Sequence, residues 1–208
     1  MTGTTTAVLL AAGAGTRLGL GPKAMLPFRG RPLIEHQVRV LRDGGCATVL
    51  AVLGAGRGDI LAAARLQDAR PVLNPDWQRG MGTSYRSGVA AALALCPGAV
   101  LVALVDQPGL TAAVVARLLA AGRPGRITAA GYRDPGSDRL RRGHPVLFDA
   151  ALAARSLEPG EAADDGDAGD TGARHFLAAH PDLVDLIDCS DLADGRDVDS
   201  EADLVLLD

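Results

Sequence analysis

The chain has 208 residues, of which 48% are hydrophobic but only 3% aromatic, and its formal net charge at pH 7 is −4. This length predicts a single domain spanning residues 1–208, with a core large enough to fold without disulfides or a structural metal. The negative charge and the scarcity of aromatic side chains argue against a general nucleic-acid binder, because such proteins need basic surfaces and stacking rings.

The N-terminus and the cysteines bear on where the protein works. The opening residues, MTGTTTAVLL, lack the basic region followed by a long apolar run that is typical of a signal peptide. No uncharged apolar run approaches the roughly 20 residues of a membrane helix. Cys46, Cys96 and Cys189 are odd in number and far apart, which fits neither a disulfide framework nor a CxxC metal site. We therefore expect a cytoplasmic protein with no membrane partner.

The first element is the stretch VLLAAGAGTRLGLGPKAMLP, which predicts a buried strand over Val8–Leu10 followed by a glycine-rich turn. The small residues Ala11 to Gly13 let a ligand approach the backbone, and successive N–H groups in such a turn bind anions. Arg17 and Lys23 add positive charge. Together these features are typical of a polyphosphate site.

Two better-known glycine motifs compete for this stretch. A Walker loop needs Gly-Lys-Ser/Thr at a helix start, whereas Lys23 lies between a proline and an alanine. A dinucleotide fingerprint is closer, because Gly13, Gly15 and Gly19 follow a strand as GxGxxxG. It expects an acidic residue about 20 positions on, yet the next candidate strand ends in GAGR. Arg57 in that segment keeps a ligand with a 2′-phosphate open.

The longer pattern LAAGxGxRLGxxPKxxLPxxGxPLIEH resembles the opening of the MobA-like nucleotidyltransferase superfamily. In that family the loop cradles the phosphates of a nucleoside triphosphate, and the lysine after the proline neutralises them. The resemblance therefore implies catalytic roles for Arg17 and Lys23. It implies nucleotide contacts at Leu10, Ala11, Ala12, Gly13, Gly15 and Lys23. The alternative is a tight strand-to-helix turn with a surface lysine.

Beyond this stretch, helical and strand-like patterns alternate. Helices are predicted over Pro32–Arg42, Asp59–Leu66 and Thr111–Ala121, and strands over Ala47–Leu53, Pro71–Leu73, Ala99–Val105, Ile127–Tyr132 and Leu183–Ile187. The core must be built of Ala, Leu and Val, which suits helices packed on a parallel sheet. The predicted fold class is therefore α/β, a Rossmann-like three-layer α/β/α arrangement with a mostly parallel sheet.

The segment NPDWQRGMGTSYRSG leads into another predicted helix, which Thr83 or Ser84 caps. Two glycines lie at the predicted N-terminus of this helix, so free N–H groups would point at a bound ligand. The segment resembles the part of the family that faces the base and sugar of the nucleotide. This resemblance implies nucleotide contacts at Asn74, Gly82 and Ser84, whereas ordinary helix capping with a tight turn is the alternative.

The most strand-like run, Ala99–Val105, ends in Asp106. Ligands of open α/β sheets bind beyond the carboxyl ends of the strands, and a carboxylate there suits Mg²⁺ beside phosphates. The segment VDQPGL also resembles the metal-binding segment of the molybdenum-cofactor branch of the family. The resemblance implies that Asp106 is catalytic and binds the metal, whereas capping of the following turn is the alternative.

Arg133–Arg142 is rich in Gly, Pro, Asp and Arg and predicts a mobile loop. The segment GHPVLF that follows resembles the acceptor side of the same branch, which implies that Arg142, Gly143 and His144 hold the second substrate. A histidine between glycine and proline is otherwise a turn residue.

The segment Glu158–Asp170 is acidic and predicts a solvated loop, longer and more charged than the family leads us to expect. At its end, GDTGAR resembles the GDxGAR segment of the family, which implies that Asp170 also contacts the acceptor, and it opens a helix to about Ala179. The role of the acidic residues before it stays open.

The tail, DGRDVDSEADL, resembles DIDTPEDL of the family. Alternation along an extended segment puts Asp197 and Asp199 on one face, where they are candidates to share a metal with Asp106. Which of the two binds the metal stays open, and an Asx-type helix start before Leu204–Leu207 is the alternative.

These parts fit in-line transfer of a nucleotidyl group, in which an acceptor phosphate attacks the α-phosphorus of a nucleoside triphosphate and pyrophosphate leaves. Such catalysis is positioning plus charge stabilisation. The segments DQPGL, GHPVLF and GDTGAR look most like molybdenum cofactor cytidylyltransferases. The resemblance implies CTP and molybdopterin-bound molybdenum as substrates and Mg²⁺ as cofactor. It also implies a molybdoenzyme of the xanthine dehydrogenase type as a further partner.

Several alternatives stay open. GTP replaces CTP in one of them, and another small phosphate such as a sugar phosphate, phospholactate or methylerythritol phosphate replaces the acceptor in a second. An NAD(P)H-dependent oxidoreductase would use the glycine fingerprint without a metal. A non-catalytic chaperone would bind molybdenum cofactor without releasing pyrophosphate. The oligomeric state is open as well.

Overall fold

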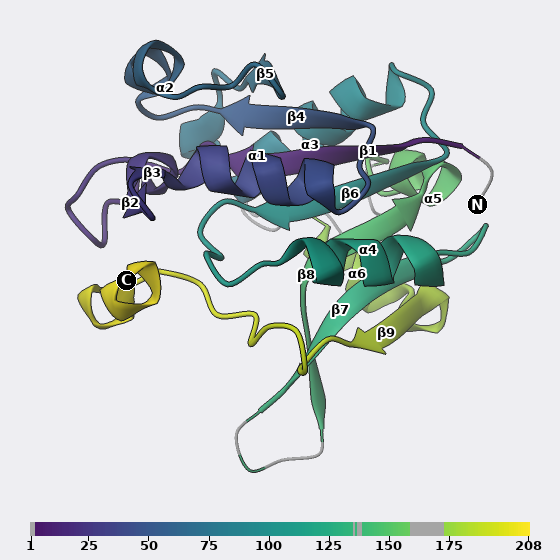
Figure 1. Ribbon diagram of the computed structural model, residues 1–208. Helices are drawn as coiled ribbons and strands as arrows, with labels where there is room; N and C mark the ends of the chain where they lie inside the picture. Colours follow the sequence, from purple (N-terminus) through teal and green to yellow (C-terminus); the bar gives the residue numbers. More distant parts are fainter. Residues whose placement is uncertain (1–2, 135, 137–138, 159–172) are drawn as a thin grey trace.

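The computed structural model describes residues 3–134, 136, 139–158 and 173–208. Within these ranges the main sheet has seven strands in the order β5-β4-β1-β6-β8-β7-β9 (Figure 1). The strands are β1 (Thr5–Ala11), β4 (Thr48–Leu53), β5 (Arg70–Leu73), β6 (Ala99–Leu104), β7 (Ile127–Arg133), β8 (Leu140–Asp149) and β9 (Val184–Asp188). All run in one direction except β8, which pairs antiparallel with both neighbours. The predicted α/β fold with a mostly parallel sheet is confirmed.

Helices cover both faces of the sheet and make three layers (Figure 1). The helices α1 (Leu33–Asp43), α2 (Arg57–Ala63) and α4 (Ala112–Ala121) contribute to one apolar cluster, and α3 (Met81–Leu93), α5 (Ala150–Arg155) and α6 (Arg174–Ala179) to the other. In β1, Ala7 and Leu9 join the first cluster, whereas Val8 and Leu10 join the second. Because strand side chains alternate between faces, a strand that is buried on both sides is apolar throughout.

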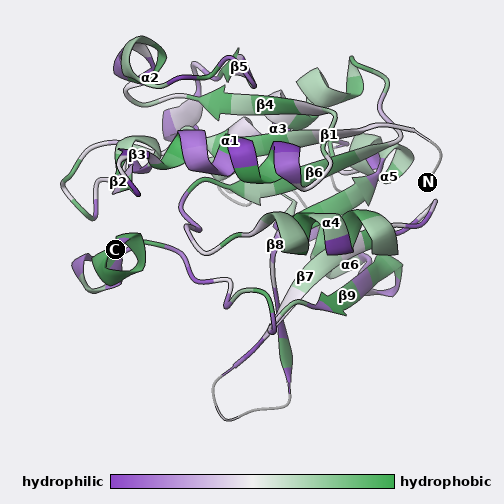
Figure 2. Cartoon of the chain, in the orientation of Figure 1, coloured by the Kyte–Doolittle hydropathy of each residue, from purple (hydrophilic) through white to green (hydrophobic). Residues whose placement is uncertain are grey.

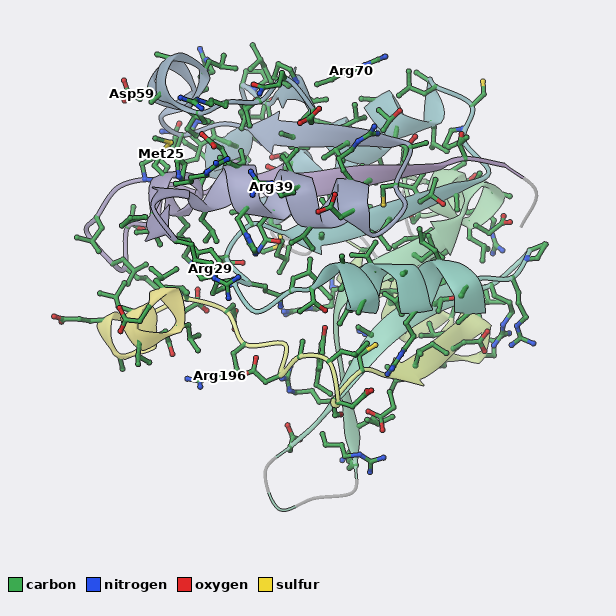
Figure 3. The ribbon with its side chains drawn as sticks, viewed as in Figure 1. Met25, Arg29, Arg39, Asp59, Arg70 and Arg196 are labelled. Carbon is green, nitrogen blue, oxygen red and sulfur yellow. The ribbon has the colours of Figure 1, made fainter. Side chains whose placement is uncertain are left out.

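The helix α1 is apolar where it meets the sheet and polar on its outer side. In α1, Leu33 and Leu41 are fully buried, whereas Arg39 is exposed. Figure 2 shows hydrophobic residues along the strands and hydrophilic residues on the outer side of α1. Figure 3 shows the charged side chains of Asp59 and Arg70 pointing away from the fold. None of the described helices is long and apolar enough to cross a membrane.

Short elements connect these layers at the end of the sheet where β1 and β6 finish. At that end lie η1 (Lys23–Met25), β2 (Pro27–Phe28), β3 (Arg31–Pro32), η2 (Trp77–Arg79) and η4 (Glu201–Leu207), whereas η3 (Pro181–Leu183) leads into the start of β9 at the opposite end. The strands β2 and β3 form a two-stranded sheet of their own. Lys23 thus lies at the start of a single turn of 3₁₀-helix rather than in an open loop.

The predicted cap of α3 was wrong. The helix α3 begins at Met81 after Gly80, whose φ of 110° turns the chain, and neither Thr83 nor Ser84 caps it. Instead, the Thr83 hydroxyl donates to the Gly80 carbonyl from within the first turn, at 2.9 Å. Thr111 does cap α4, accepting a hydrogen bond from the backbone three residues on.

The predicted loop over Arg133–Arg142 is strand at its two ends. Arg133 is the last residue of β7, and β8 begins at Leu140, so that the two strands form an arm that extends beyond the helices (Figure 1). Arg133, Arg141 and Arg142 are exposed in this arm, and an exposed strand needs no apolar residues there. Polar composition therefore did not distinguish this hairpin from a loop.

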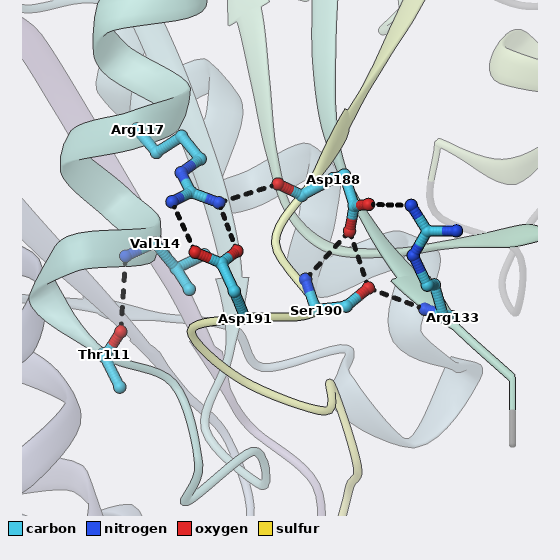
Figure 4. Close-up of polar contacts among 7 residues, drawn as sticks. All are labelled: Thr111, Val114, Arg117, Arg133, Asp188, Ser190 and Asp191. Atoms are coloured by element: carbon cyan, nitrogen blue, oxygen red, sulfur yellow. Dashed lines mark hydrogen bonds and ion pairs between the residues drawn. The ribbon is translucent and has the colours of Figure 1, made fainter.

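A polar network fixes the turn after β9 (Figure 4). Arg117 of α4 makes a two-pronged ion pair with Asp191 and donates to the Asp188 carbonyl, 2.9 Å away. The Asp188 carboxylate accepts hydrogen bonds from Ser190 and from the Arg133 guanidinium. These contacts hold the start of the C-terminal segment against α4 and β7.

The C-terminal segment then returns to the end of β6. The Val198 N–H donates to the Asp106 carbonyl at 2.8 Å, and the Val198 side chain is fully buried. On the way the backbone crosses the ring of Tyr132 at Gly195, whose φ is +66°. A Cβ at Gly195 would lie 2.2 Å from that ring, so both the turn and the close approach require glycine.

Candidate active site

A cavity of about 670 Å³ opens at the carboxyl ends of β1 and β6. The glycine-rich stretch, η1, η2, the start of α3 and the C-terminal segment surround it. Its walls are Leu10, Ala12, Gly13, Ala14, Gly15, Thr16, Arg17, Lys23, Trp77, Gln78, Gly80, Met81, Ser84, Leu104, Val105, Asp106, Arg174, Asp197 and Asp199. Open α/β sheets bind ligands at this end of their strands.

The glycine-rich stretch folds back on itself beside the cavity. The N–H groups of Leu18 and Gly19 donate to the Gly15 carbonyl at 3.1 and 3.2 Å. Gly15 has a φ of +63°, and a Cβ there would lie 2.2 Å from the Gly21 carbonyl oxygen. Glycine is therefore required for this tight turn, which leaves small side chains and backbone on the cavity wall.

Lys23 bridges two carboxylates across the cavity. Its Nζ donates to Asp106 Oδ2 at 2.8 Å and also forms an ion pair with Asp199. Burial alone would lower the pKa of Lys23, but the hydrogen bonds and charges of both aspartates raise it above its ordinary value. The ammonium is therefore charged at neutral pH.

Asp106, Asp197 and Asp199 form one carboxylate cluster, with a potential ligand atom of each within 4.8 Å of the others. Burial and the charges of Asp106 and Asp199 raise the pKa of Asp197, whereas the hydrogen bond from Lys23 lowers that of Asp199. Oxygen donors on two separate elements fit a hard divalent cation such as Mg²⁺. The predicted metal ligands are thus brought together.

A second cavity of about 340 Å³ adjoins the first. Both cavities are lined by Leu10, Met81, Leu104, Arg174 and Asp197. The remaining walls of the second cavity are Tyr85, Val102, Arg142, Gly143, His144, Val146, Phe148, Ala173 and Leu177. It therefore combines an apolar floor with the predicted acceptor-binding residues Arg142 to His144.

His144 is neutral in this second cavity. Burial lowers its pKa to about 4, an effect that the charge of Asp106 opposes and that of Arg142 reinforces. The Tyr132 hydroxyl donates to the His144 carbonyl at 2.8 Å, and the Tyr132 ring leaves no room for a Cβ at Gly143. A neutral imidazole can donate and accept hydrogen bonds but supplies no positive charge.

Three of the predicted nucleotide contacts do not reach the cavity wall. Ala11, Asn74 and Gly82 are buried behind it. The Asn74 amide donates to Thr83 and Ser84, at 2.9 and 3.0 Å, so it orients the first turn of α3. Asp170, the fourth predicted acceptor contact, lies outside the described residues.

Sequence reasoning missed two large side chains. Trp77 and Arg174 line the first cavity, and Arg174 also lines the second. Both lie in segments that the sequence singled out, NPDWQRGMGTS and GDTGAR. The predicted helix start at GDTGAR agrees with α6, which begins at Arg174, but the position of Arg174 on the walls of both cavities depends on the fold.

Comparisons with known proteins agree with this geometry. A profile described as the MobA-like NTP transferase domain matches residues 7–184. A molybdenum cofactor guanylyltransferase of Xanthomonas euvesicatoria is 33% identical over 161 residues, which cover 73% of this chain and 75% of that one. The crystal structure of Rv0371c from Mycobacterium tuberculosis is 27% identical, with a TM-score of 0.80 over 100% of this chain and 99% of that one.

One relative carries a different name. A nicotine blue oxidoreductase of Paenarthrobacter nicotinovorans is 53% identical over 196 residues, which cover 94% of this chain and 92% of that protein. The fold and the family profile together define the class of this protein as that of the nucleotidyltransferases. The chain belongs to the MobA-like NTP transferase family.

Proposed function

We propose that residues 1–208 act as one domain that transfers a nucleotidyl group from CTP to the phosphate of molybdenum cofactor, with Mg²⁺, and releases pyrophosphate. The observation that carries this proposal is the common wall of the two cavities, which includes Arg174 and Asp197, and Asp197 belongs to the carboxylate cluster. A triphosphate in the first cavity and a phosphorylated acceptor in the second would meet at that wall.

The chain's own residues supply positioning and charge. Backbone N–H groups of the glycine-rich stretch would bind the phosphates. Lys23 and Arg17 would neutralise the charge that grows on the leaving pyrophosphate. Asp106, Asp197 and Asp199 would hold Mg²⁺, which when bound offsets charge on the phosphoryl oxygens.

On the acceptor side, the reaction requires no general base. The acceptor phosphate is already ionised at neutral pH, so one of its oxygens can attack the α-phosphorus directly. The bond from that phosphorus to the bridging oxygen breaks, and its electron pair leaves on pyrophosphate. Arg142, His144 and Arg174, together with Gly143 and Asp170, would orient the acceptor for this in-line attack.

The choice of CTP rests on the motifs DQPGL, GHPVLF and GDTGAR, and the guanylyltransferase relative makes GTP the main competitor. Trp77, the one tryptophan in the sequence, lines the first cavity, so its fluorescence reports on ligands there. We would titrate CTP, GTP, ATP and UTP with and without Mg²⁺, then add molybdenum cofactor and measure pyrophosphate.

The outcomes of this experiment separate the candidates. A magnesium-dependent change with CTP, followed by pyrophosphate release, supports the proposal. The same result with GTP would support a nucleotidyltransferase that uses guanine rather than cytosine nucleotides. Pyrophosphate release only with a sugar phosphate, phospholactate or methylerythritol phosphate would identify that compound as the acceptor in place of molybdenum cofactor. Binding of molybdenum cofactor without pyrophosphate release indicates a chaperone.

The 53% identity to the nicotine blue oxidoreductase favours a second candidate, an NAD(P)H-dependent oxidoreductase. It would use the glycine-rich stretch for the pyrophosphate of the dinucleotide, with Arg57 available to a 2′-phosphate. Titration of NADH and NADPH, with Asp106→Asn as the control variant, tests it. Metal-independent binding that survives this substitution would favour the oxidoreductase, because that function does not need the carboxylate cluster.

A further inference from the structure

The ammonium of Lys23 lies among the carboxylates proposed to hold the metal. It is 2.8 Å from Asp106 Oδ2 and ion-paired with Asp199, and these two belong to the carboxylate cluster completed by Asp197. The same aspartates therefore serve two cations, one built into the chain and one from solution. Like charges repel at such short range, so the two cations oppose each other there.

The stem of Lys23 passes along the glycine-rich stretch. A Cβ built on Gly15 would lie 3.4 Å from Lys23 Cγ, so the side chain runs from η1 past the turn that faces the cavity. Lys23 also lines the first cavity, where the triphosphate is proposed to bind, and the outer part of its stem has rotatable bonds. Rotation of this one side chain would therefore exchange carboxylate partners for phosphate partners.

The composition of the chain supports a special role for this amine. Lys23 is the one lysine among 21 Lys and Arg residues. An ammonium is a compact point charge on a flexible stem, whereas guanidinium is a planar fork suited to fixed two-pronged pairs such as Arg117 with Asp191. A cation that must change partners is better served by the ammonium.

We propose that Lys23 is an exchangeable occupant of the metal site, which couples metal binding to triphosphate binding. In the free protein Lys23 competes with the divalent cation for Asp106 and Asp199. A triphosphate draws the ammonium onto its own oxygens and releases the carboxylates to the metal. By linkage, each ligand then strengthens the binding of the other by the same factor. This inference rests on the proposed function, because it needs both ligands.

The test measures Mn²⁺ affinity by electron paramagnetic resonance of free Mn²⁺, in wild type and in Lys23→Met, without nucleotide. Lys23→Met keeps the length of the stem and removes the charge. We expect it to bind Mn²⁺ about tenfold or more tightly than wild type, the lower end of the coupling measured for close charge pairs. Adding CTP or GTP should tighten Mn²⁺ binding to wild type far more than to the variant.

Controls distinguish competition by Lys23 from a general effect of charge and from misfolding of the variant. Arg17→Gln removes a cation near the cluster that forms no ion pair within the described structure, and it should change Mn²⁺ affinity much less. Thermal melts verify that Lys23→Met is folded, and Lys23→Gln replaces it if it is not. Asp106→Asn should abolish Mn²⁺ binding in every background.

Each result bears on a different claim. Equal or weaker Mn²⁺ binding by the folded lysine variants would overturn the competition, while leaving the nucleotidyltransferase proposal intact. Two results would instead contradict the metal site of the proposed function: Mn²⁺ binding that persists in Asp106→Asn, or no Mn²⁺ binding by any of the proteins. Either result would also overturn this inference, because the inference needs that metal site. Tighter binding in Lys23→Met together with a lost response to nucleotide supports the coupling.

Discussion

Gly195→Ala is the sharpest test of how the C-terminal segment reaches the site. At a φ of +66°, alanine costs about 1–2 kcal/mol. The added Cβ would lie 2.2 Å from the Tyr132 ring, and Tyr132 is only 1% exposed. Because that ring cannot move outward, the overpacking costs a further ~1–3 kcal/mol.

The C-terminal segment can relieve this strain by detaching from the end of β6. Detachment would expose Val198, at about 1.5–3 kcal/mol, and break its hydrogen bond to Asp106, at about 1 kcal/mol. The two responses cost similar amounts, so we expect an unfolding free energy lower by about 2–4 kcal/mol. For a chain of this size the Tm falls by roughly 5–15 °C.

The matched control is Gly125→Ala. Gly125 has a φ of +70° and nothing within 4 Å of its ideal Cβ, so it carries the backbone strain without the clash. Both substitutions reduce the entropy of the unfolded chain equally, and that effect cancels. Thermal melts compare stability, and Mn²⁺ titration reports on the carboxylate cluster, which only Gly195→Ala should weaken. Equal melting temperatures and unchanged Mn²⁺ affinity in both variants would refute the reasoning.

Three further predictions follow from the site. Asp106→Asn should lower the rate of pyrophosphate release by about 100- to 1,000-fold without changing the fold, and near-normal turnover would remove Asp106 from the chemistry. Tyr132→Phe loses the hydrogen bond to the His144 carbonyl, so the KM of the acceptor should rise while the nucleotide Kd stays constant. Burial lowers the pKa of His144 from 6.5 to about 4, so the neutral ring stabilises the fold fully above pH 6.5 and progressively less as pH falls toward 4. His144→Gln should flatten the unfolding free energy across that window in urea denaturation, and an unchanged slope would contradict the assignment.

The sheet was predictable because its parallel strands are buried on both faces. An apolar run such as Ala99–Val105 needs no partner information to be recognised, and β6 covers nearly all of it. The strand β8 was harder, because its first residues lie on the solvent-exposed arm and carry charge. Its antiparallel direction depends on the hairpin with β7, a pairing that polar composition hides.

In the candidate site, too, some features could be predicted from the sequence and others could not. Local pattern was enough to select Lys23, Asp106, Asp197 and Asp199, which the structure brings together. What joins them is non-local, since the C-terminal segment reaches β6 only through contacts with residues far away in sequence. For Asn74 the local pattern was misleading. This motif residue does not line the cavity, and its amide instead donates hydrogen bonds to the first turn of α3.

A chain with a single lysine offers an unusual spectroscopic opportunity. Reductive methylation with ¹³C-formaldehyde modifies amines only, so in this protein it labels the Lys23 side chain and the chain terminus and nothing else. A two-dimensional carbon–proton spectrum would then contain one side-chain resonance, which belongs to the cavity and needs no assignment. The centre of the proposed chemistry is thus visible as the one side-chain peak of a protein of 208 residues.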